Sequence, residues 1–174
     1  VDRARALVPR ELDERGAATY RFYFEGTSDP SLTGASGDPR ASVLFTGGHG
    51  LVLEPMAAAA EALVAAAPVT CAVMVDVNCR PRIVPSREPY VARVERVLRR
   101  ADVVKVSDED LGYLFPDLPA LDAARAVLAL GPKAVLLTAG GGSVQVIARD
   151  GETEVPVPRV DVVDTIGAGD SFGG

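Results

Sequence analysis

The chain has 174 residues, of which 48% are hydrophobic, and its formal net charge is -6 at pH 7. This length and apolar content suit one sizeable buried core, so we expect a single domain. The acidic balance argues against a general nucleic-acid binder, because phosphate contacts need a basic face.

No apolar run reaches the length that spans a bilayer, and no hydrophobic segment follows the charged N-terminus as in a signal peptide. The sequence therefore predicts a soluble protein that makes no contact with a membrane. Cys71 lies in an apolar run and Cys79 in a polar loop. Two such cysteines make neither a disulfide framework nor a zinc site, and a reducing cytoplasm fits them best.

The N-terminal quarter of the chain gives few signals of regular structure. Its first fifteen residues mix both charges, and Pro9 interrupts any helix drawn through them. Residues 18–24 are rich in aromatic and β-branched side chains, which predicts a strand. Residues 26–40 have the composition of a loop.

From residue 42 onward the chain alternates between strand and helix patterns. Residues 42–46 predict a short buried strand, and a glycine turn then leads into a helix over 51–67, with Pro55 near its start. Residues 70–75 form a continuous apolar run that ends at Asp76, as in a parallel strand covered on both faces.

An amphipathic helix is expected over residues 87–100. Its basic stripe of Arg93, Arg96 and Arg100 lies opposite the apolar face, and we interpret it as a solvated surface. The remaining elements are a strand, two helices, a further strand and an antiparallel strand pair, expected over 101–106, 107–115, 121–130, 133–138, 144–148 and 153–157. This alternation predicts a Rossmann-like α/β fold, in which a mainly parallel sheet has flanking helices and right-handed crossovers.

The last eleven residues read Asp-Thr-Ile-Gly-Ala-Gly-Asp-Ser-Phe-Gly-Gly. Gly167, Ala168 and Gly169 let consecutive backbone N–H groups turn toward a common point, and the amides of a following helix face the same way, which makes an anion site. Asp170 places a carboxylate beside it, an arrangement that suits a phosphoryl group whose acceptor must lose a proton. A glycine-rich turn capped by Asp is the structural alternative.

This C-terminal string closely resembles the signature of the ribokinase-like (PfkB) carbohydrate kinases, and the chain is similar to their fructokinase-like members from about Thr19 onward. The resemblance implies a ribokinase-like α/β domain over 1–174 with part of a small β lid, which residues 17–26 form or adjoin. It implies phosphorylation of a sugar hydroxyl by ATP with Mg²⁺, in which Asp170 is the base. Family members extend beyond both ends of the matched region, so we expect a fragment of a longer kinase.

A second motif follows the strand that ends at Asp76. Ligands of open α/β sheets bind at such strand ends, although Asp and Asn in a turn also bond their own backbone. Asp76-Val77-Asn78-Cys79-Arg80 resembles the Asp-Pro-Asn-x-Arg stretch of fructokinase-like and 2-keto-3-deoxygluconate-kinase-like enzymes, with Val77 in place of proline. The resemblance implies that Asp76, Asn78 and Arg80 bind the substrate.

Two further motifs bear on the nucleotide. Ser107-x-x-Asp110 has the spacing of a helix capping box, and it also resembles the Asn-x-x-Glu motif of the family, which is associated with magnesium and phosphate. This likeness assigns Lys105 and Ser107 to the nucleotide site and Asp110 to Mg²⁺, through water. Thr138-Ala139-Gly140 resembles the Thr-x-Gly nucleotide contact, which adds Thr138 and Gly140 to the cofactor site.

Several alternatives remain open from the sequence. Within the family, the chain resembles ribokinases, 2-keto-3-deoxygluconate kinases and nucleoside kinases as well. Outside catalysis, it is compatible with a sugar- or nucleotide-binding module that kept the fold. A P-loop ATPase is disfavoured, because no Gly-x-x-x-x-Gly-Lys-Ser/Thr string is present. The expected partners are a sugar and ATP, without nucleic acid, and lid strands that pair between subunits would make a homodimer.

Overall fold

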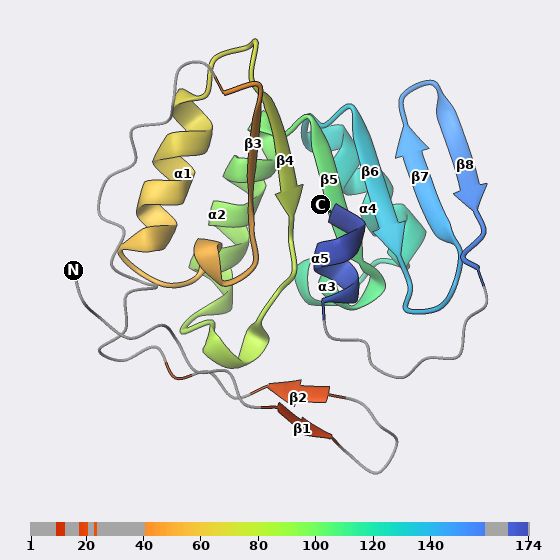
Figure 1. The fold of residues 1–174 in the computed structure, drawn as a ribbon, viewed down its shortest axis with the longest axis horizontal. Coiled ribbons are helices and arrows are strands. Elements are labelled where there is room, and N and C mark those ends of the chain that lie inside the picture. The colour runs from red at the N-terminus through yellow and green to blue at the C-terminus, as the bar shows by residue number, and fades with distance from the viewer. Residues whose placement is uncertain (1–9, 13–17, 21–22, 24–40, 159–166, 174) are drawn as a thin grey trace.

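The computed structural model describes residues 10–12, 18–20, 23, 41–158 and 167–173. Six strands form the main sheet in the order β3-β4-β5-β6-β7-β8 (Figure 1). The first four strands run parallel, and they are β3 (Val43–Gly47), β4 (Ala72–Asp76), β5 (Val103–Ser107) and β6 (Ala134–Thr138). The hairpin of β7 (Val144–Ala148) and β8 (Gly151–Val155) adds antiparallel strands at one edge. The expected α/β fold with a mainly parallel sheet is confirmed.

Helices connect the parallel strands, as the alternating sequence pattern predicts. They are α1 (Met56–Ala66), α2 (Arg87–Arg100), α3 (Asp108–Leu114) and α4 (Ala120–Leu130), with α5 (Ala168–Gly173) near the C-terminus. Short 3₁₀ helices lie at η2 (Gly48–Leu51) and η3 (Pro81–Ile83). None of the helices in these ranges is long and apolar enough to cross a bilayer.

The helix expected over 51–67 begins later than predicted, at Met56. Leu51 still belongs to η2, and the N–H groups of Val52 and Leu53 both donate to the carbonyl of His49. Pro55 has no N–H to donate, so the backbone pattern of a helix cannot run through it without interruption. The regular helix therefore starts directly after the proline.

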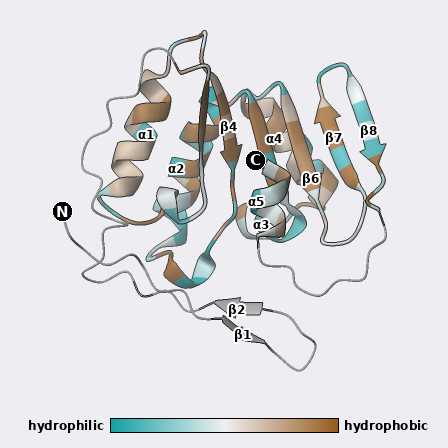
Figure 2. Ribbon diagram, in the orientation of Figure 1, coloured by the Kyte–Doolittle hydropathy of each residue, from teal (hydrophilic) through white to brown (hydrophobic). Residues whose placement is uncertain are grey.

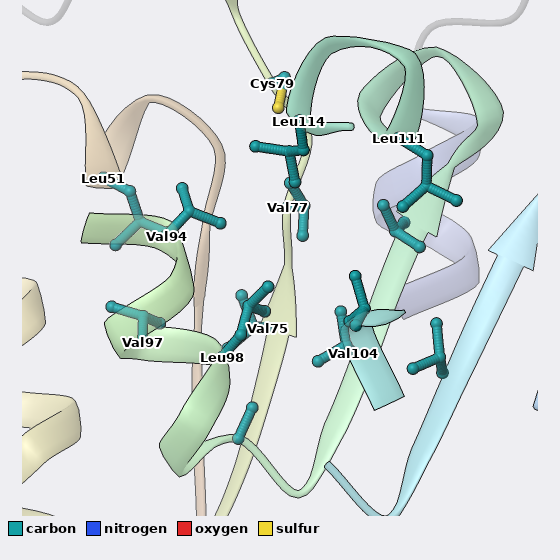
Figure 3. Close-up of a cluster of buried hydrophobic side chains, with 14 of the residues drawn as sticks. Leu51, Val75, Val77, Cys79, Val94, Val97, Leu98, Val104, Leu111 and Leu114 are labelled. Atoms are coloured by element: carbon teal, nitrogen blue, oxygen red, sulfur yellow. The ribbon is translucent and has the colours of Figure 1, made fainter. Parts of the chain in front are cut away.

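One face of the sheet, which we call the helix-covered face, carries the core. Alternate residues of the strands, including Val75 and Val104, pack there against Val94 and Leu98 of α2 and against Leu111 of α3 (Figure 3). Side chains from α1 and α4 belong to the same cluster. Figure 2 shows the central strands as largely hydrophobic, which agrees with the apolar runs of the sequence.

The opposite face, which we call the α5 face, is covered differently. A β-carbon on Gly173 would lie 3.6 Å from the Phe45 ring and 3.9 Å from Met74 Cε, so α5 packs on the set of strand residues that points away from the core. Val43 and Phe45 are nevertheless 60% and 53% exposed. The prediction of a buried strand over 42–46 is therefore wrong for this face, because within the described chain β3 is an edge strand that α5 covers only in part.

The basic stripe of α2 is a solvated surface only in part, because Arg96 is exposed whereas Arg93 and Arg100 are half-buried. Arg93 is ion-paired with Glu54 and Glu61, and Arg96 pairs with Glu61 as well. Arg100 donates to the carboxylate of Asp102 and to three backbone carbonyls between α1 and β4. The stripe thus fastens α2 to its neighbours, which the helical pattern alone cannot reveal.

A separate two-stranded sheet lies near the N-terminus. β1 (Arg10–Leu12) pairs antiparallel with β2 (Ala18–Tyr20), and in Figure 1 the pair lies on the side toward which the parallel strands point. The strand expected over 18–24 is found in its first part, whereas residues 21, 22 and 24 lie outside the described residues. β1 gave no clear signal in the sequence.

Candidate active site

A buried ion pair lies at the carboxyl ends of β4 and β5. Asp76 and Lys105 are register partners on neighbouring parallel strands, so their side chains project from the same face, the α5 face. Lys105 Nζ lies 3.0 Å from Asp76 Oδ1 and 3.2 Å from Oδ2. The two residues are 4% and 6% exposed, respectively. The pair is thus a fixed, desolvated charge arrangement at the edge where ligands of such sheets bind.

The carboxylate of Asp76 has spare capacity to accept a hydrogen bond. Only Oδ2 is aligned with the Lys105 ammonium for a hydrogen bond, whereas Oδ1 is within ion-pair distance but accepts none among the described residues. Burial raises the pKa of Asp76, Lys105 opposes this rise, and the negative charges of Asp110 and Asp170 add to it. Asp110 and Asp170 therefore act on the same electrostatic environment as the ion pair.

Helix α5 brings the glycine-rich motif onto this pair. Gly167 precedes the helix with a φ of 71°, in the left-handed region that favours glycine, and its carbonyl accepts from Ser171 N over 2.8 Å. A β-carbon on Gly169 would lie 3.1 Å from Lys105 Nζ, so the motif rests directly above the buried ammonium. Asp170 follows in the first turn of α5 and is exposed.

The segment after β4 forms a compact turn. Asn78 has a φ of 40°, a left-handed conformation that asparagine tolerates better than most residues do, and its Nδ2 would lie 3.7 Å from a β-carbon on Gly48. Gly48 N donates to the Val77 carbonyl over 3.3 Å, which ties this turn to the end of β3. Asn78 and Arg80 are half-buried, so they are more accessible than Asp76.

Asp110 is held by backbone groups. Its side chain completes the expected capping box with Ser107, whose hydroxyl accepts from Asp110 N over 3.1 Å and whose own N–H donates to Asp110 Oδ2 over 2.9 Å. Asp110 Oδ1 accepts from Cys79 N over 2.6 Å. The capping box is confirmed, and the bond to Cys79 is a contact that the sequence did not predict.

The predicted nucleotide residues at the end of β6 lie one strand further along the sheet. Thr138 is the register partner of Ser107, and both lie on the α5 face with Lys105. Gly140 has a φ of 51°, which favours glycine in the loop that follows. Thr138 is thereby adjacent to the Ser107 end of the site, whereas Gly140 is exposed beyond the strand.

Two participants were not singled out in the sequence. Gly47 faces the backbone of Asp76 at the end of β3, and the signal for it was the glycine run that closes the predicted strand. Cys79 links Asp110 to the turn, and Tyr90 Oη donates to its Sγ over 3.5 Å. Burial raises the pKa of the Cys79 thiol to about 12. For the ion pair itself, the sequence holds one signal: Lys105 is the single charged residue within the apolar strand Val-Val-Lys-Val-Ser, and a charge buried in this way needs a partner.

A cleft of about 370 Å³ lies elsewhere, between η2 and the start of α2. Leu51, Tyr90 and Arg93 line it, and it includes none of the predicted site residues. Leu51 is a core residue of the helix-covered face, so this cleft is separate from the chemistry gathered on the α5 face.

Comparisons with known proteins show which family the chain is similar to. Residues 40–174 match the family described as pfkB family carbohydrate kinase. The chain is 37% identical over 163 residues to a fructokinase of Rhizobium leguminosarum bv. trifolii, covering 90% of this chain and 49% of that protein. It is also 32% identical to fructokinase-1 of Oryza sativa subsp. japonica, covering 97% of this chain and 54% of that protein.

A crystal structure of fructokinase with bound ATP from Xylella fastidiosa superposes with a TM-score of 0.85 at 26% identity, covering 99% of this chain and 56% of that one. The chain thus spans about half the length of the relatives it matches. The family match extends over most of the described chain, including every residue of the candidate site from Asp76 to Asp170. The protein therefore belongs to the pfkB family of carbohydrate kinases.

Proposed function

We propose that the protein transfers the γ-phosphoryl group of ATP to a hydroxyl group of a sugar, as a cytoplasmic enzyme of the fructokinase type. The observation that carries the proposal is the position of Asp170, in the first turn of α5 and beside a glycine motif that rests on the buried Lys105. The relatives named above support it, since they are fructokinases and one of them holds ATP.

In the proposed reaction, Asp170 accepts the proton of the attacking sugar hydroxyl. The hydroxyl oxygen forms a bond to the γ-phosphorus, the bond between that phosphorus and the bridging oxygen breaks, and ADP leaves with the electron pair. The backbone N–H groups of Gly167, Ala168 and Gly169 would stabilise the negative charge that develops on the phosphoryl oxygens. The exposure of Asp170 suits this role, because the carboxylate must reach a bound substrate.

The substrate segment after β4 would bind the sugar. Arg80 and Asn78 are half-buried and accessible at the strand end, and Asp76 Oδ1 has the capacity to accept a hydrogen bond from a sugar hydroxyl. On the nucleotide side, Lys105, Ser107, Thr138 and Gly140 would lie toward ATP. The β1–β2 pair, which contains residues 18–20 of the expected lid segment 17–26, would contribute to a lid that pairs between subunits.

Magnesium fits this site as an ion that arrives with ATP. Mg²⁺ keeps several waters and is commonly held by one or two carboxylates together with substrate phosphates, whose charge it neutralises. Among the residues that the structure describes, no three or more His, Cys, Asp and Glu side chains form a cluster that would hold a metal. The water-mediated contact of Asp110 with this ion stays a prediction from the sequence, and a changed Mg²⁺ requirement of an Asp110→Asn variant would be its signature.

Replacing the proposed base tests the function. In the full-length protein, Asp170→Asn is close to isosteric but cannot accept the proton, so kcat should fall by ~10²–10⁴, or about 3–5 kcal/mol of barrier. ATP affinity should stay within a few-fold of wild type. The neighbouring exposed Ser171→Ala serves as the control, and fructose, ribose, 2-keto-3-deoxygluconate and adenosine are the acceptors to compare. A kcat for Asp170→Asn near the wild-type value would rule out this mechanism.

A further inference from the structure

Two backbone N–H groups from different strand ends meet at the carboxylate of Asp110. Cys79 N donates to Oδ1 over 2.6 Å, and Ser107 N donates to Oδ2 over 2.9 Å. Asp110 is 6% exposed, and bonds from N–H groups to a buried carboxylate are among the stronger hydrogen bonds in proteins. This single side chain therefore fastens the turn after β4 to the end of β5.

Arg80 is linked to Asp110 through Cys79. Arg80 Nη1 donates to the Cys79 carbonyl over 3.2 Å, so the guanidinium lies against the residue that Asp110 holds. The Tyr90 hydroxyl donates to Cys79 Sγ over 3.5 Å, which fixes the side chain of the same residue. With Cys79 only 7% exposed, a shift of this residue would also move Arg80.

We propose that Asp110 is a positioning residue for the sugar acceptor, which orients Arg80 through Cys79 and joins the substrate turn to the nucleotide side at Ser107. The inference rests on the proposed sugar-kinase function and gives Asp110 a task that differs from the magnesium contact expected from the sequence. Both carboxylate oxygens already face a backbone N–H group, so the geometry favours a structural coupling of the two half-sites.

The kinetic test uses Asp110→Asn in the full-length protein. The amide keeps one acceptor oxygen but turns an NH₂ group toward the other N–H donor, so one of the two bonds is lost. The KM for the sugar should rise about tenfold, as expected for loss of a hydrogen bond to a charged group, while the KM for ATP and the Mg²⁺ concentration for half-activation stay unchanged. Glu109→Gln, an exposed neighbour in the same helical turn, is the matched control.

Coupling to Arg80 provides a second kinetic criterion. Because Asp110 acts through Arg80 in this proposal, Asp110→Asn should raise the sugar KM little further when Arg80→Ala is already present. Fully additive effects of the two substitutions on the sugar KM would overturn the proposal. An unchanged sugar KM in the single Asp110→Asn variant, or an Mg²⁺ requirement that rises as much as the sugar KM, would overturn it as well.

The two cysteines give a readout that does not depend on activity. Cys79 is anchored by Asp110, whereas Cys71 lies before the start of β4 and is 3% exposed. Under native conditions, Asp110→Asn should increase the alkylation rate of Cys79 by iodoacetamide about fivefold or more, as measured by peptide mass spectrometry, and leave that of Cys71 unchanged. No increase at Cys79 would overturn the proposal. If the wild type phosphorylates no sugar, the proposed function fails and this labelling alone decides whether Asp110 holds the turn.

Equal increases in the alkylation rates of Cys71 and Cys79 would mean that the Asp110→Asn variant has lost its fold. The Asp110→Glu variant then tests the positioning role. Glutamate keeps the helix cap and a carboxylate that a metal can use, but its longer side chain moves the second oxygen away from Cys79 N. The sugar KM and the alkylation rate of Cys79 should both rise about threefold or more. A change of this size corresponds to losing part of the free energy of a hydrogen bond to a charged group. Wild-type values of both quantities in Asp110→Glu would overturn the positioning role.

Discussion

Gly47 ends β3 in such close contact with Asp76 that a β-carbon on Gly47 would lie 1.7 Å from the Asp76 carbonyl oxygen. The two residues are register partners at the carboxyl ends of neighbouring parallel strands. No side chain fits between two backbones at this distance, so the approach of β3 to the candidate site depends on glycine. The end of β4 at Asp76 is therefore held by backbone packing against β3 on one side and by the ion pair with Lys105 of β5 on the other.

Gly47→Ala should lower the free energy of unfolding by about 1–3 kcal/mol, because the added methyl group forces the ends of β3 and β4 apart. Gly50→Ala is the matched control, since a β-carbon there meets nothing within 4 Å. That substitution should be neutral or stabilise by about 0.4–1 kcal/mol through the unfolded state. Urea denaturation of the two variants measures the contrast, and equal stabilities would contradict the close contact.

Lys105→Met should destabilise the protein by about 3–5 kcal/mol, because it leaves the buried Asp76 carboxylate without its counter-ion. Adding Asp76→Asn to this variant should recover part of the loss. Chemical denaturation of the two single variants and the double variant gives the coupling energy. Strict additivity would show that the two charges do not depend on each other.

The Lys105→Met variant also has a characteristic pH dependence. Burial already raises the pKa of Asp76 above its value in the unfolded chain, and loss of Lys105 raises it further. A group with a raised folded-state pKa binds its proton more tightly when folded, so stability falls as pH rises from the unfolded value through the folded one. Relative to wild type, Lys105→Met should therefore regain stability as pH is lowered from about 7 toward about 5. A difference in unfolding free energy that is constant over this range would contradict it.

Arg80→Ala should raise the KM for the sugar more than it lowers kcat, because a contact made equally with the bound substrate and the transition state contributes to binding only. Arg80 is half-buried beside Cys79, whereas Arg82 two residues later is exposed, so Arg82→Ala serves as the control. Steady-state kinetics with each accepted sugar gives the result. An unchanged KM for the sugar would show that Arg80 has only a structural role in the turn.

Asp102→Asn should cost about 1–3 kcal/mol near neutral pH. The carboxylate accepts from Lys133 Nζ over 2.8 Å and from Val73 N over 2.9 Å, and these bonds lower its pKa, with the Lys133 contact as the largest cause. A lowered pKa gives stability that is present above the unfolded value and is lost as pH falls through the folded one. The difference between wild type and variant should therefore shrink below about pH 4 in urea titrations, and a difference that persists in acid would contradict it.

Much of the fold could be predicted because its determinants are local. The apolar runs that became β4, β5 and β6 are short and end in polar turns, and the capping box of Ser107 and Asp110 marks the start of α3 within a residue or two. The exposure of Phe45 could not be predicted, since an apolar residue in a short run looks the same whether or not another layer covers it.

The contacts within the candidate site could not be predicted from the sequence. Asp76 and Lys105 were assigned to the substrate and to the nucleotide, and only the strand order shows that they face each other. The partner of Asp110 is the backbone N–H of Cys79, 31 residues earlier. Every residue except proline has a backbone N–H donor, so the side chain at position 79 does not indicate that this hydrogen bond to Asp110 forms.

Successive side chains of β4 and β5 point to opposite faces of the sheet, so each strand contributes alternate residues to the core and to the candidate site. Val75 and Val104 belong to the core, whereas Asp76 and Lys105, each one position later, belong to the site. Inserting a single residue within either strand would exchange the two sets and bury charge in the core while lifting valines into the site. The strand that supports the chemistry is thus also the part of the chain least able to change length, and variation in this protein must enter through substitutions or through its loops.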